Sequence, residues 1–224
     1  MARGDRASKD ALFDGFATIA AALGAGRRAE IVEVLSQGER TVEEMAGEIG
    51  QSVANTSHHL RALARVGLVA TRREGNRVHY RMASDRVTDA WLAIRALAAE
   101  RLDTLDDLAE AYLGLRDDLD VVDSQDVQRR MADRDIVILD VRPSAEYRAG
   151  HIPGALSVPP DELHRLDQVL GQISPDAEII AYCRGPYCVY ADEAVRWLAS
   201  RGRMARRLSE GMPEWRRAGG PVEV

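Results

Sequence analysis

The stretch that decides the fold of the first half is residues 52–80, SVANTSHHLRALARVGLVATRREGNRVHY. Its first part has apolar residues at helical spacing, and Ser52 occupies the N-cap position. Gly67 ends the expected helix, and the pattern then changes to a period of two in the segments on either side of residues 74–76. The stretch therefore predicts a helix followed directly by a β-hairpin.

Further helices are expected on both sides of this stretch. Residues 11–23 and 27–36 carry apolar side chains at helical spacing, and Thr41 and Glu44 form a T-x-x-E capping box that opens a third helix. Residues 87–115 predict one or two long helices with a continuous apolar stripe. So long a stripe on a small domain indicates a dimer surface, or packing against its own domain, or both.

The charge of the chain is uneven. The net charge is −6 over 224 residues, yet residues 58–86 contain seven arginines against only Glu74 and Asp85. A local basic patch in an acidic chain is what phosphate binding requires. A solvated arginine-rich face would look the same, so charge alone does not decide between them.

The second half follows a different pattern, in which strands alternate with helices. Residues 136–141 (IVILDV), 178–183 (EIIAYC) and 205–211 (ARRLSEG) read as strands separated by helical segments. This alternation predicts a parallel sheet covered on both faces. The fold class expected is thus two domains, a mainly-α domain followed by an α/β domain, with the boundary near residues 116–122.

Several features limit the cellular setting. No run of about 18 apolar residues is present, so no membrane partner is expected. Residues 1–10 lack the apolar core of a secretory signal and read as a disordered tail. A cytoplasmic protein is expected. The two cysteines, Cys183 and Cys188, are too few for a disulfide framework, but their spacing suggests one shared site.

The motifs SHHL at 57–60, RVGLV at 65–69 and RREG at 72–75 resemble the ArsR/SmtB family of repressors. The resemblance covers residues 11–100 and implies a winged helix-turn-helix that binds double-stranded DNA as a symmetric homodimer. Residues 101–120 would then be the end of the dimerisation helix and a linker.

The candidate DNA contacts lie on the expected recognition helix and on the wing. A recognition helix reaches base edges with the exposed residues of its N-terminal part, and basic side chains elsewhere contact phosphates. The expected base contacts are Asn55, Ser57 and His58, and the expected phosphate or minor-groove contacts are Arg61, Arg65, Arg72, Arg73 and Arg77. His79, on the wing, is expected to be a solvated edge residue, and His59 to be partly core.

The sequence departs from metal-sensing members of that family. Such members carry cysteines in the helix that corresponds to residues 41–50, or Asp/His sets on the dimer helices. This chain has no Cys before Cys183 and no His between His79 and His151. No metal site and no cofactor are expected, so a signal would have to enter elsewhere.

Residues 121–224 resemble the rhodanese family, which moves sulfane sulfur through a cysteine persulfide. The resemblance rests on DVR at 140–142 with GHIPGA at 150–155, and on SEGMPEW at 209–215. It implies a rhodanese-like domain with Cys183 as its nucleophile. The related phosphatases have a longer loop with an arginine where this chain has Val189, so phosphate chemistry is not expected.

The reactivity of Cys183 has a physical reason in this reading. Cys183 would leave a strand and turn within a few residues into a helix that starts near Val189, so the amides of 184–189 and the helix N-terminus would lower the pKa of the thiol. Four residues are expected to support this site: Arg184 by its charge, Gly185 by tolerating positive φ, and Asp140 and Arg142 by holding the loop.

Two roles for Cys188 stay open. It could attack persulfidated Cys183 and form a disulfide or polysulfide bridge, or it could be a small buried apolar residue. The leading hypothesis is a DNA-binding repressor that senses or carries reactive sulfur at Cys183, with a small sulfur donor such as polysulfide or thiosulfate. The alternative is an active sulfurtransferase that the DNA-binding domain targets or regulates. A third is a catalytically inactive interaction domain.

Overall fold

The computed structural model describes residues 4–131, 136–171 and 173–224. The chain divides into two compact units, Met1–Ile94 and Arg95–Val224. The division falls within a helix and earlier than the boundary expected near residues 116–122. Leu119, within the expected boundary, already belongs to the core of the second unit.

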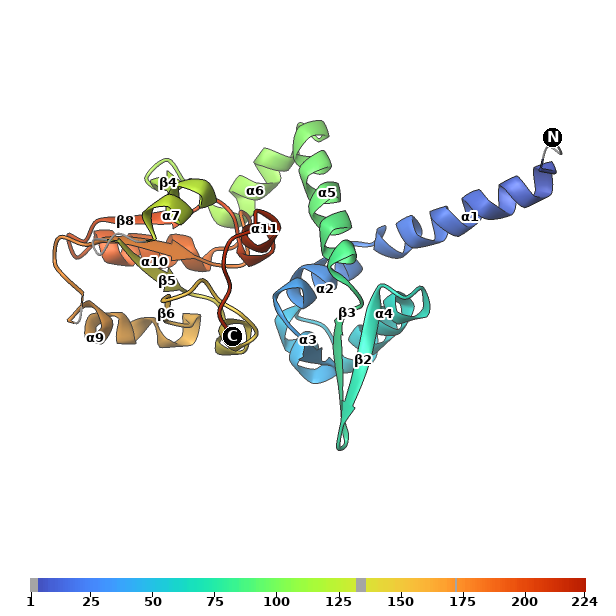
Figure 1. Cartoon of the computed structure of the whole chain (residues 1–224), viewed down its shortest axis with the longest axis horizontal. Helices are drawn as coiled ribbons and strands as arrows, with labels where there is room; N and C mark the ends of the chain where they lie inside the picture. The colour runs from blue at the N-terminus through green and yellow to red at the C-terminus, as the bar shows by residue number, and fades with distance from the viewer. Residues whose placement is uncertain (1–3, 132–135, 172) are drawn as a thin grey trace. The chain divides into compact units, whose positions relative to one another are not determined.

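The first unit combines helices with a small antiparallel sheet (Figure 1). Its elements are α1 Arg6–Leu23, α2 Gly26–Gln37, β1 Arg40–Thr41, α3 Val42–Glu48, α4 Val53–Arg65, β2 Val69–Glu74, β3 Arg77–Met82 and the start of α5 Asp85–Arg101. Ile31, Met45, Leu60 and Leu63 are fully buried in its core. The expected helix, turn and hairpin order is confirmed, and the capping box between Thr41 and Glu44 is formed in full.

The expected disordered tail at residues 1–10 is wrong from Arg6 onward, where α1 begins. The local reason is a cap: the Asp5 carboxylate accepts hydrogen bonds from the Ser8 amide at 3.0 Å and from the Ser8 hydroxyl at 2.6 Å. A carboxylate at the N-cap satisfies amides that the first helical turn leaves unpaired.

The expectation that His79 is a solvated edge residue is also wrong. The short strand β1 pairs with β3, with Thr41 opposite His79, so β3 is the central strand of the order β1-β3-β2. The side chain of His79 is 17% exposed and lies 3.8 Å from Glu39. A two-residue strand carries too little pattern to be recognised in a sequence.

The second unit is built on a parallel sheet, as expected (Figure 1). The strands are β4 Val121–Val122, β5 Ile136–Asp140, β6 Leu156–Ser157, β7 Glu178–Tyr182 and β8 Ala205–Leu208, in the order β4-β8-β7-β5-β6. The helices are the end of α5, α6 Leu105–Leu113, α7 Ser124–Arg130, α8 Ser144–Arg148, the 3-10 helix η1 Pro160–Arg165, α9 Leu166–Leu170, α10 Tyr190–Ala199 and α11 Met212–Arg217.

Two apolar clusters cover this sheet because successive strand residues point to opposite faces. Ile179 and Ala181 pack with α10, in the cluster that also contains Cys183. Ile180 and Tyr182 belong to the other cluster, which contains Trp215. The residues of β7 after Glu178 are all buried, so Cys183, which directly follows this strand, starts from the core of the second unit. Among the helices of the described residues, none is both long and apolar enough to cross a bilayer.

Candidate functional site: a cysteine loop and a recognition helix

The two cysteines lie on one loop between β7 and α10. Cys183 follows the last residue of β7 and is 2% exposed, whereas Cys188 is half-buried. A disulfide joins them, with the two Cα atoms 6.5 Å apart. That separation is within the range that a disulfide can span. The loop is therefore curled enough for the two sulfur atoms to react with each other.

The backbone of this loop is partly used to close its own turn. The amide of Cys188 donates to the carbonyl oxygen of Gly185 at 3.2 Å. This amide therefore stabilises the turn of the loop. The sequence had predicted that the amides of residues 184–189 converge on one sulfur atom, and the amide of Cys188 does not take part in such an arrangement. Gly185, with φ of 159°, is buried within the same turn.

The sequence predicted that Arg184 supports Cys183 by its positive charge. In the structure this charge is directed to a carboxylate instead. Its guanidinium Nε donates to Glu146 Oε1 at 2.9 Å, and the carboxylate of Glu146 is fully buried. A buried carboxylate without a cationic partner is strongly unfavourable. Arg184 therefore compensates Glu146 and fastens the start of the loop to α8.

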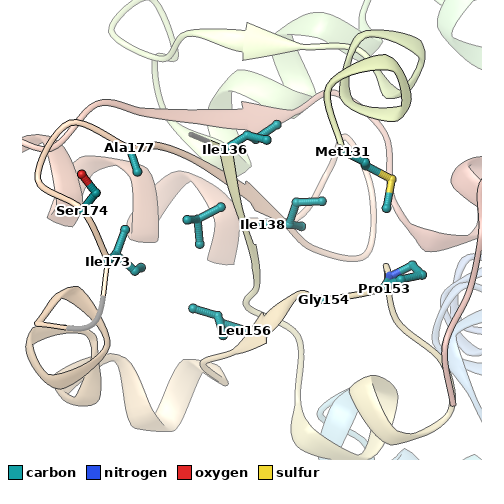
Figure 2. A pocket seen from close by; sticks show the side chains of 10 residues that line it. Met131, Ile136, Ile138, Pro153, Gly154, Leu156, Ile173, Ser174 and Ala177 are labelled. Atoms are coloured by element: carbon teal, nitrogen blue, oxygen red, sulfur yellow. The ribbon is translucent and has the colours of Figure 1, made fainter. Parts of the chain in front are cut away.

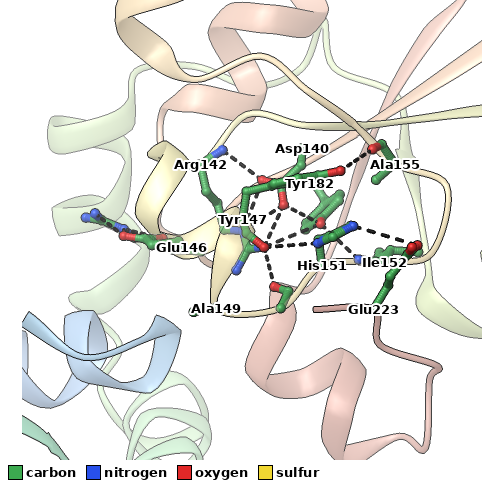
Figure 3. Close-up of polar contacts among 12 residues, drawn as sticks. Asp140, Arg142, Glu146, Tyr147, Ala149, His151, Ile152, Ala155, Tyr182 and Glu223 are labelled. Carbon is green, nitrogen blue, oxygen red and sulfur yellow. Dashed lines mark hydrogen bonds and ion pairs between the residues drawn. The ribbon is translucent and has the colours of Figure 1, made fainter.

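Asp140, Arg142 and Tyr182 form a buried network directly before the loop (Figure 3). The guanidinium of Arg142 donates to the Asp140 carboxylate at 2.6 Å and to the carbonyl oxygen of Gly150 at 2.9 Å. The phenol of Tyr182 donates to Asp140 and accepts from the amide of Ile152 at 3.1 Å. The expected role of Asp140 and Arg142 is thus refined: they hold Tyr182, the residue before Cys183, rather than the loop itself.

The electrostatics of this network keep its groups in fixed protonation states. Burial, and then the neighbouring charge of Asp140, raise the pKa of the Tyr182 phenol. Burial alone would lower the pKa of the Arg142 guanidinium, but the hydrogen bonds to Asp140 and the negative charge of Asp140 together outweigh it and raise this pKa. The phenol stays neutral and the guanidinium stays charged across the physiological range, which makes the network a rigid support.

Gly211 is a site residue that the sequence reasoning missed. A Cβ atom at this position would lie 2.0 Å from the carbonyl oxygen of Arg184 and 2.6 Å from the amide nitrogen of Gly185. The backbone before α11 therefore touches the backbone of the cysteine loop, and glycine is required for that approach. Its place inside the SEGMPEW motif was the available signal.

His151, the histidine of the GHIPGA motif, is held by packing and by contacts with neighbouring residues. His151 is 7% exposed and stacks on the ring of Tyr147 with centroids 3.7 Å apart. Its Nδ1 lies 3.0 Å from the carbonyl oxygen of Tyr147 (Figure 3). No role in chemistry at Cys183 is needed to explain this arrangement.

The expected DNA-reading residues of α4 are accessible. Asn55, His58, Arg61 and Arg65 are exposed, and Ser57 is partly exposed. The helix starts with a cap in which the amide of Asn55 donates to Ser52 Oγ at 3.3 Å. Its buried side carries Thr56, Leu60 and Leu63. The exposed face is thus separated from the core face, as a groove-entering helix requires.

The wing arginines fall into two groups. Arg73 and Arg77 are exposed at the end of the hairpin. Arg72 is also exposed, but its guanidinium is held by Glu39 and, at 2.7 Å, by Glu74. The hydrogen bond from Arg72 holds the pKa of each carboxyl below its usual value. A phosphate would have to compete with two carboxylates for Arg72.

His59 is half-buried on the same helix, which agrees with its expected partial burial. Burial, followed by the positive charge of His58, Arg28 and Arg27, lowers the pKa of this imidazole. His59 is thus neutral over more of the physiological range than an ordinary histidine.

One pocket of the second unit lies away from the cysteine loop and does not compete with it as a ligand site. A pocket of about 370 Å³ is lined by apolar residues such as Ile136, Ile138 and Leu156 (Figure 2). It lies at the start of β5, whereas ligands of parallel sheets bind beyond the carboxyl ends of the strands. Within the described residues, no three His, Cys, Asp or Glu side chains are grouped to hold a metal ion.

Comparison with known proteins supports the family resemblance of each half of the chain. Residues 26–71 match the model of bacterial regulatory proteins of the arsR family, and residues 123–218 match the rhodanese-like domain. The chain is 41% identical over 215 residues to the HTH-type transcriptional regulator Rv0324 of Mycobacterium tuberculosis, covering 96% of this chain and 93% of the relative.

Two further similarities each cover one half. A sulfurtransferase of Allochromatium vinosum is 31% identical over 102 residues, which is 45% of this chain and 92% of the relative. A solved structure of the homodimeric winged helix-turn-helix DNA-binding domain of a possible ArsR-family regulator from Mycobacterium bovis is 40% identical. It covers 46% of this chain and 94% of that domain, with a TM-score of 0.43.

Proposed function

This chain belongs to the arsR family of bacterial DNA-binding transcription regulators and carries a rhodanese-like domain, and we propose that it is a repressor whose affinity for DNA is set by sulfur chemistry at Cys183. The signal is a small donor of sulfane sulfur, such as a polysulfide. The protein acts where its DNA lies, in the bacterial cytoplasm. The observation that carries the proposal is the bridge between Cys183 and Cys188 at the end of β7.

The chemistry needs two steps. The thiolate of Cys183 attacks the sulfane sulfur of a donor RSSH, forming a persulfide on Cys183 and releasing the thiol RSH. The thiolate of Cys188 then attacks Sγ of that persulfide, forming the disulfide and releasing the outer sulfur as hydrosulfide. The two cysteines are oxidised and the sulfane sulfur is reduced, so no further oxidant is required. Two equivalents of a thiol restore the reduced pair and leave as a disulfide.

The sequence and the packing around the loop favour a reaction between Cys183 and Cys188 over chemistry at a single thiol. Cys183 is 2% exposed, and Cys188 is the more exposed of the two residues. The curl of the loop, closed by the hydrogen bond from the Cys188 amide to Gly185, keeps the second sulfur close to the first. Closure is then faster than escape of the persulfide to outside acceptors.

Dimer formation is part of the proposal. Large apolar side chains are exposed along α1, α5 and α6, namely Leu12, Phe13, Phe16, Ile19, Ile94, Leu97, Leu108 and Tyr112. Large apolar side chains left exposed in this number are typical of a protein interface. A symmetric dimer that uses it would place two copies of α4 for successive major grooves.

A DNA-binding titration tests the proposal. The reduced full-length protein and a duplex that it selects from a random pool are titrated by fluorescence anisotropy, with and without inorganic tetrasulfide. We expect the dissociation constant to change by about tenfold or more in the parent, which is typical of coupling between two sites. Cys183→Ser should lose the change.

Two controls separate this response from general damage. Arg148→Ala changes an exposed side chain on α8 and should respond like the parent. Mass spectrometry of the same samples should show the Cys183–Cys188 disulfide with no added sulfur. A full response of Cys183→Ser to tetrasulfide would refute the proposal.

The similarity to a sulfurtransferase favours one alternative function, that of an active sulfurtransferase. A working transferase must present persulfidated Cys183 to an outside acceptor, and a bridge to Cys188 consumes that sulfur. Turnover of thiosulfate with cyanide, compared between the parent and Cys188→Ser, distinguishes the two. Our proposal expects the parent to turn over little, and Cys188→Ser to be the more active protein. Rapid turnover by the parent would favour the transferase.

A further inference from the structure

Arg116 connects the cysteine loop to the segment that follows α6. It lies three residues after Leu113, the last residue of α6, and its side chain is 23% exposed. Its guanidinium Nε donates to Asp192 Oδ2 at 2.6 Å. Its two terminal nitrogens donate to the carbonyl oxygens of Pro186 at 2.6 Å and Cys188 at 3.2 Å. One side chain thus holds α10 and two peptide groups of the loop.

The two carbonyl groups belong to the part of the loop that the disulfide closes. With the bridge formed, the Cα atoms of Cys183 and Cys188 are held 6.5 Å apart, and the carbonyl groups of Pro186 and Cys188 are held with them. When the bridge is reduced, that restraint is gone and the loop gains conformations in which the carbonyls leave the guanidinium. A planar guanidinium needs its acceptors in a fixed arrangement, so it binds the oxidised loop better.

From this geometry we infer that Arg116 is a positioning residue that stabilises the bridged form of the Cys183–Cys188 pair and transmits its state to α6. The inference rests on the proposed function, since it assigns a role within the same site. A group that binds one state more tightly shifts the equilibrium toward it, and by reciprocity the state of the loop changes how firmly Arg116 is held.

The segment around Arg116 has separate anchors, so removal of the side chain leaves the fold in place. Leu119 is 8% exposed and packs in the same apolar cluster as Cys183. β4 continues from there as a strand paired with β8. Asp192 keeps a second cationic neighbour, because its Oδ1 lies 3.1 Å from Nε of Arg207.

A nearby arginine supplies a matched control. Arg196 on α10 donates to the carbonyl oxygen of Leu115 at 2.6 Å and to the carboxylate of Asp118 at 2.9 Å. It thus holds the same segment to the same helix. These hydrogen bonds go to the segment and not to the carbonyl groups of the loop, so they should not depend on whether the loop is bridged or reduced.

The experiment is a redox titration of the full-length protein in dithiothreitol buffers of known potential, read by alkylation of free thiols and mass spectrometry. We expect Arg116→Gln to raise the midpoint potential by about 30 mV or more, the equivalent of a tenfold loss of the bridged form. Arg116→Lys, which keeps the charge but has a single donor group, should fall between. Arg196→Gln should match the parent.

The same proteins are then compared for DNA affinity in the bridged and reduced forms. We expect the affinity ratio of the two forms to approach one in Arg116→Gln and to be retained in Arg196→Gln. An unchanged potential in a folded Arg116→Gln protein overturns the role of Arg116. A parent whose two forms bind DNA equally overturns the proposed function instead, while the potential still decides the role of Arg116.

Discussion

The phenol of Tyr182 donates a hydrogen bond to the carboxylate of Asp140, and the next residue along the chain is Cys183. Asp140 also accepts from the guanidinium of Arg142, and both side chains of that ion pair are fully buried. The position of the nucleophile is therefore set by a polar network in the core. The contribution of this network to the stability of the second unit can be tested without substituting either cysteine.

Asp140→Asn should destabilise the second unit strongly, because it removes the carboxylate that pairs with the fully buried guanidinium of Arg142. Removal of one partner from a buried pair costs about 3–5 kcal/mol. The free energy of unfolding can be measured in urea from the fluorescence of Trp197 and Trp215, in a Trp91→Phe background. Asp118→Asn removes an exposed partner of Arg196 and should cost much less than Asp140→Asn, because solvent screens an exposed ion pair. Equal losses in the two variants would contradict the role assigned to the network.

Gly211→Ala should disturb the cysteine loop from outside it. The added Cβ atom would lie 2.0 Å from the carbonyl oxygen of Arg184, so the loop backbone has to move. We expect slower bridge formation with tetrasulfide, measured by quenched alkylation and mass spectrometry. Gly47→Ala adds a Cβ atom in open space on α3 and should leave the rate unchanged. A parent-like rate in Gly211→Ala would show that the loop does not need this contact.

Arg65→Ala and Arg72→Ala should weaken DNA binding unequally. Arg65 is exposed on α4, whereas Arg72 already binds Glu39 and Glu74. Each phosphate contact contributes about 0.9 to the slope of log affinity against log salt concentration. Titrations at several salt concentrations should show this loss of slope for Arg65→Ala and a smaller one for Arg72→Ala. The reverse order would mean that the wing releases Arg72 from its carboxylates on binding.

The stability of the first unit should fall as the pH drops below the ordinary pKa of histidine, about 6.5. Burial is the main cause that lowers the pKa of His59 in the fold, so the unfolded chain takes up a proton more readily than the folded one. The contribution is therefore present above that value and is lost as the pH falls toward the lowered pKa. An NMR titration of the His59 ring should give a midpoint below 6.5.

His58→Gln offers a graded check on that cause. It removes the charge of His58, the second contribution to the shift, and leaves burial in place. The midpoint of His59 should therefore move upward only part of the way. A complete return to the ordinary value would show that charge, and not burial, dominates.

The sequence predicted the elements whose signals are local. The capping box of Thr41 and Glu44 and the hairpin turn around Gly75 depend on neighbours within four residues, and both are formed. The order of strands and helices in the second half also predicted its parallel sheet. The location of Cys183 after a buried strand followed from the same alternation.

The site contacts that were missed join residues far apart in the chain. Arg184 pairs with Glu146, 38 positions earlier, and Arg116 reaches Pro186, 70 positions later. The spacing of residues in the sequence does not predict such pairs. They come together only because of the order in which the strands pair in the sheet. The strand β1 was missed for the same reason, since its partner β3 lies almost forty residues further along.

Both sulfur atoms lie on one short loop with their Cα atoms 6.5 Å apart. Ring closure is therefore a first-order event within a single molecule, and its half-time does not depend on how many copies of the protein a cell contains. A regulator present at a handful of copies would answer a pulse of donor as promptly as a concentrated sample does. After such a pulse, the disulfide would persist until thiols in the surroundings reduce it.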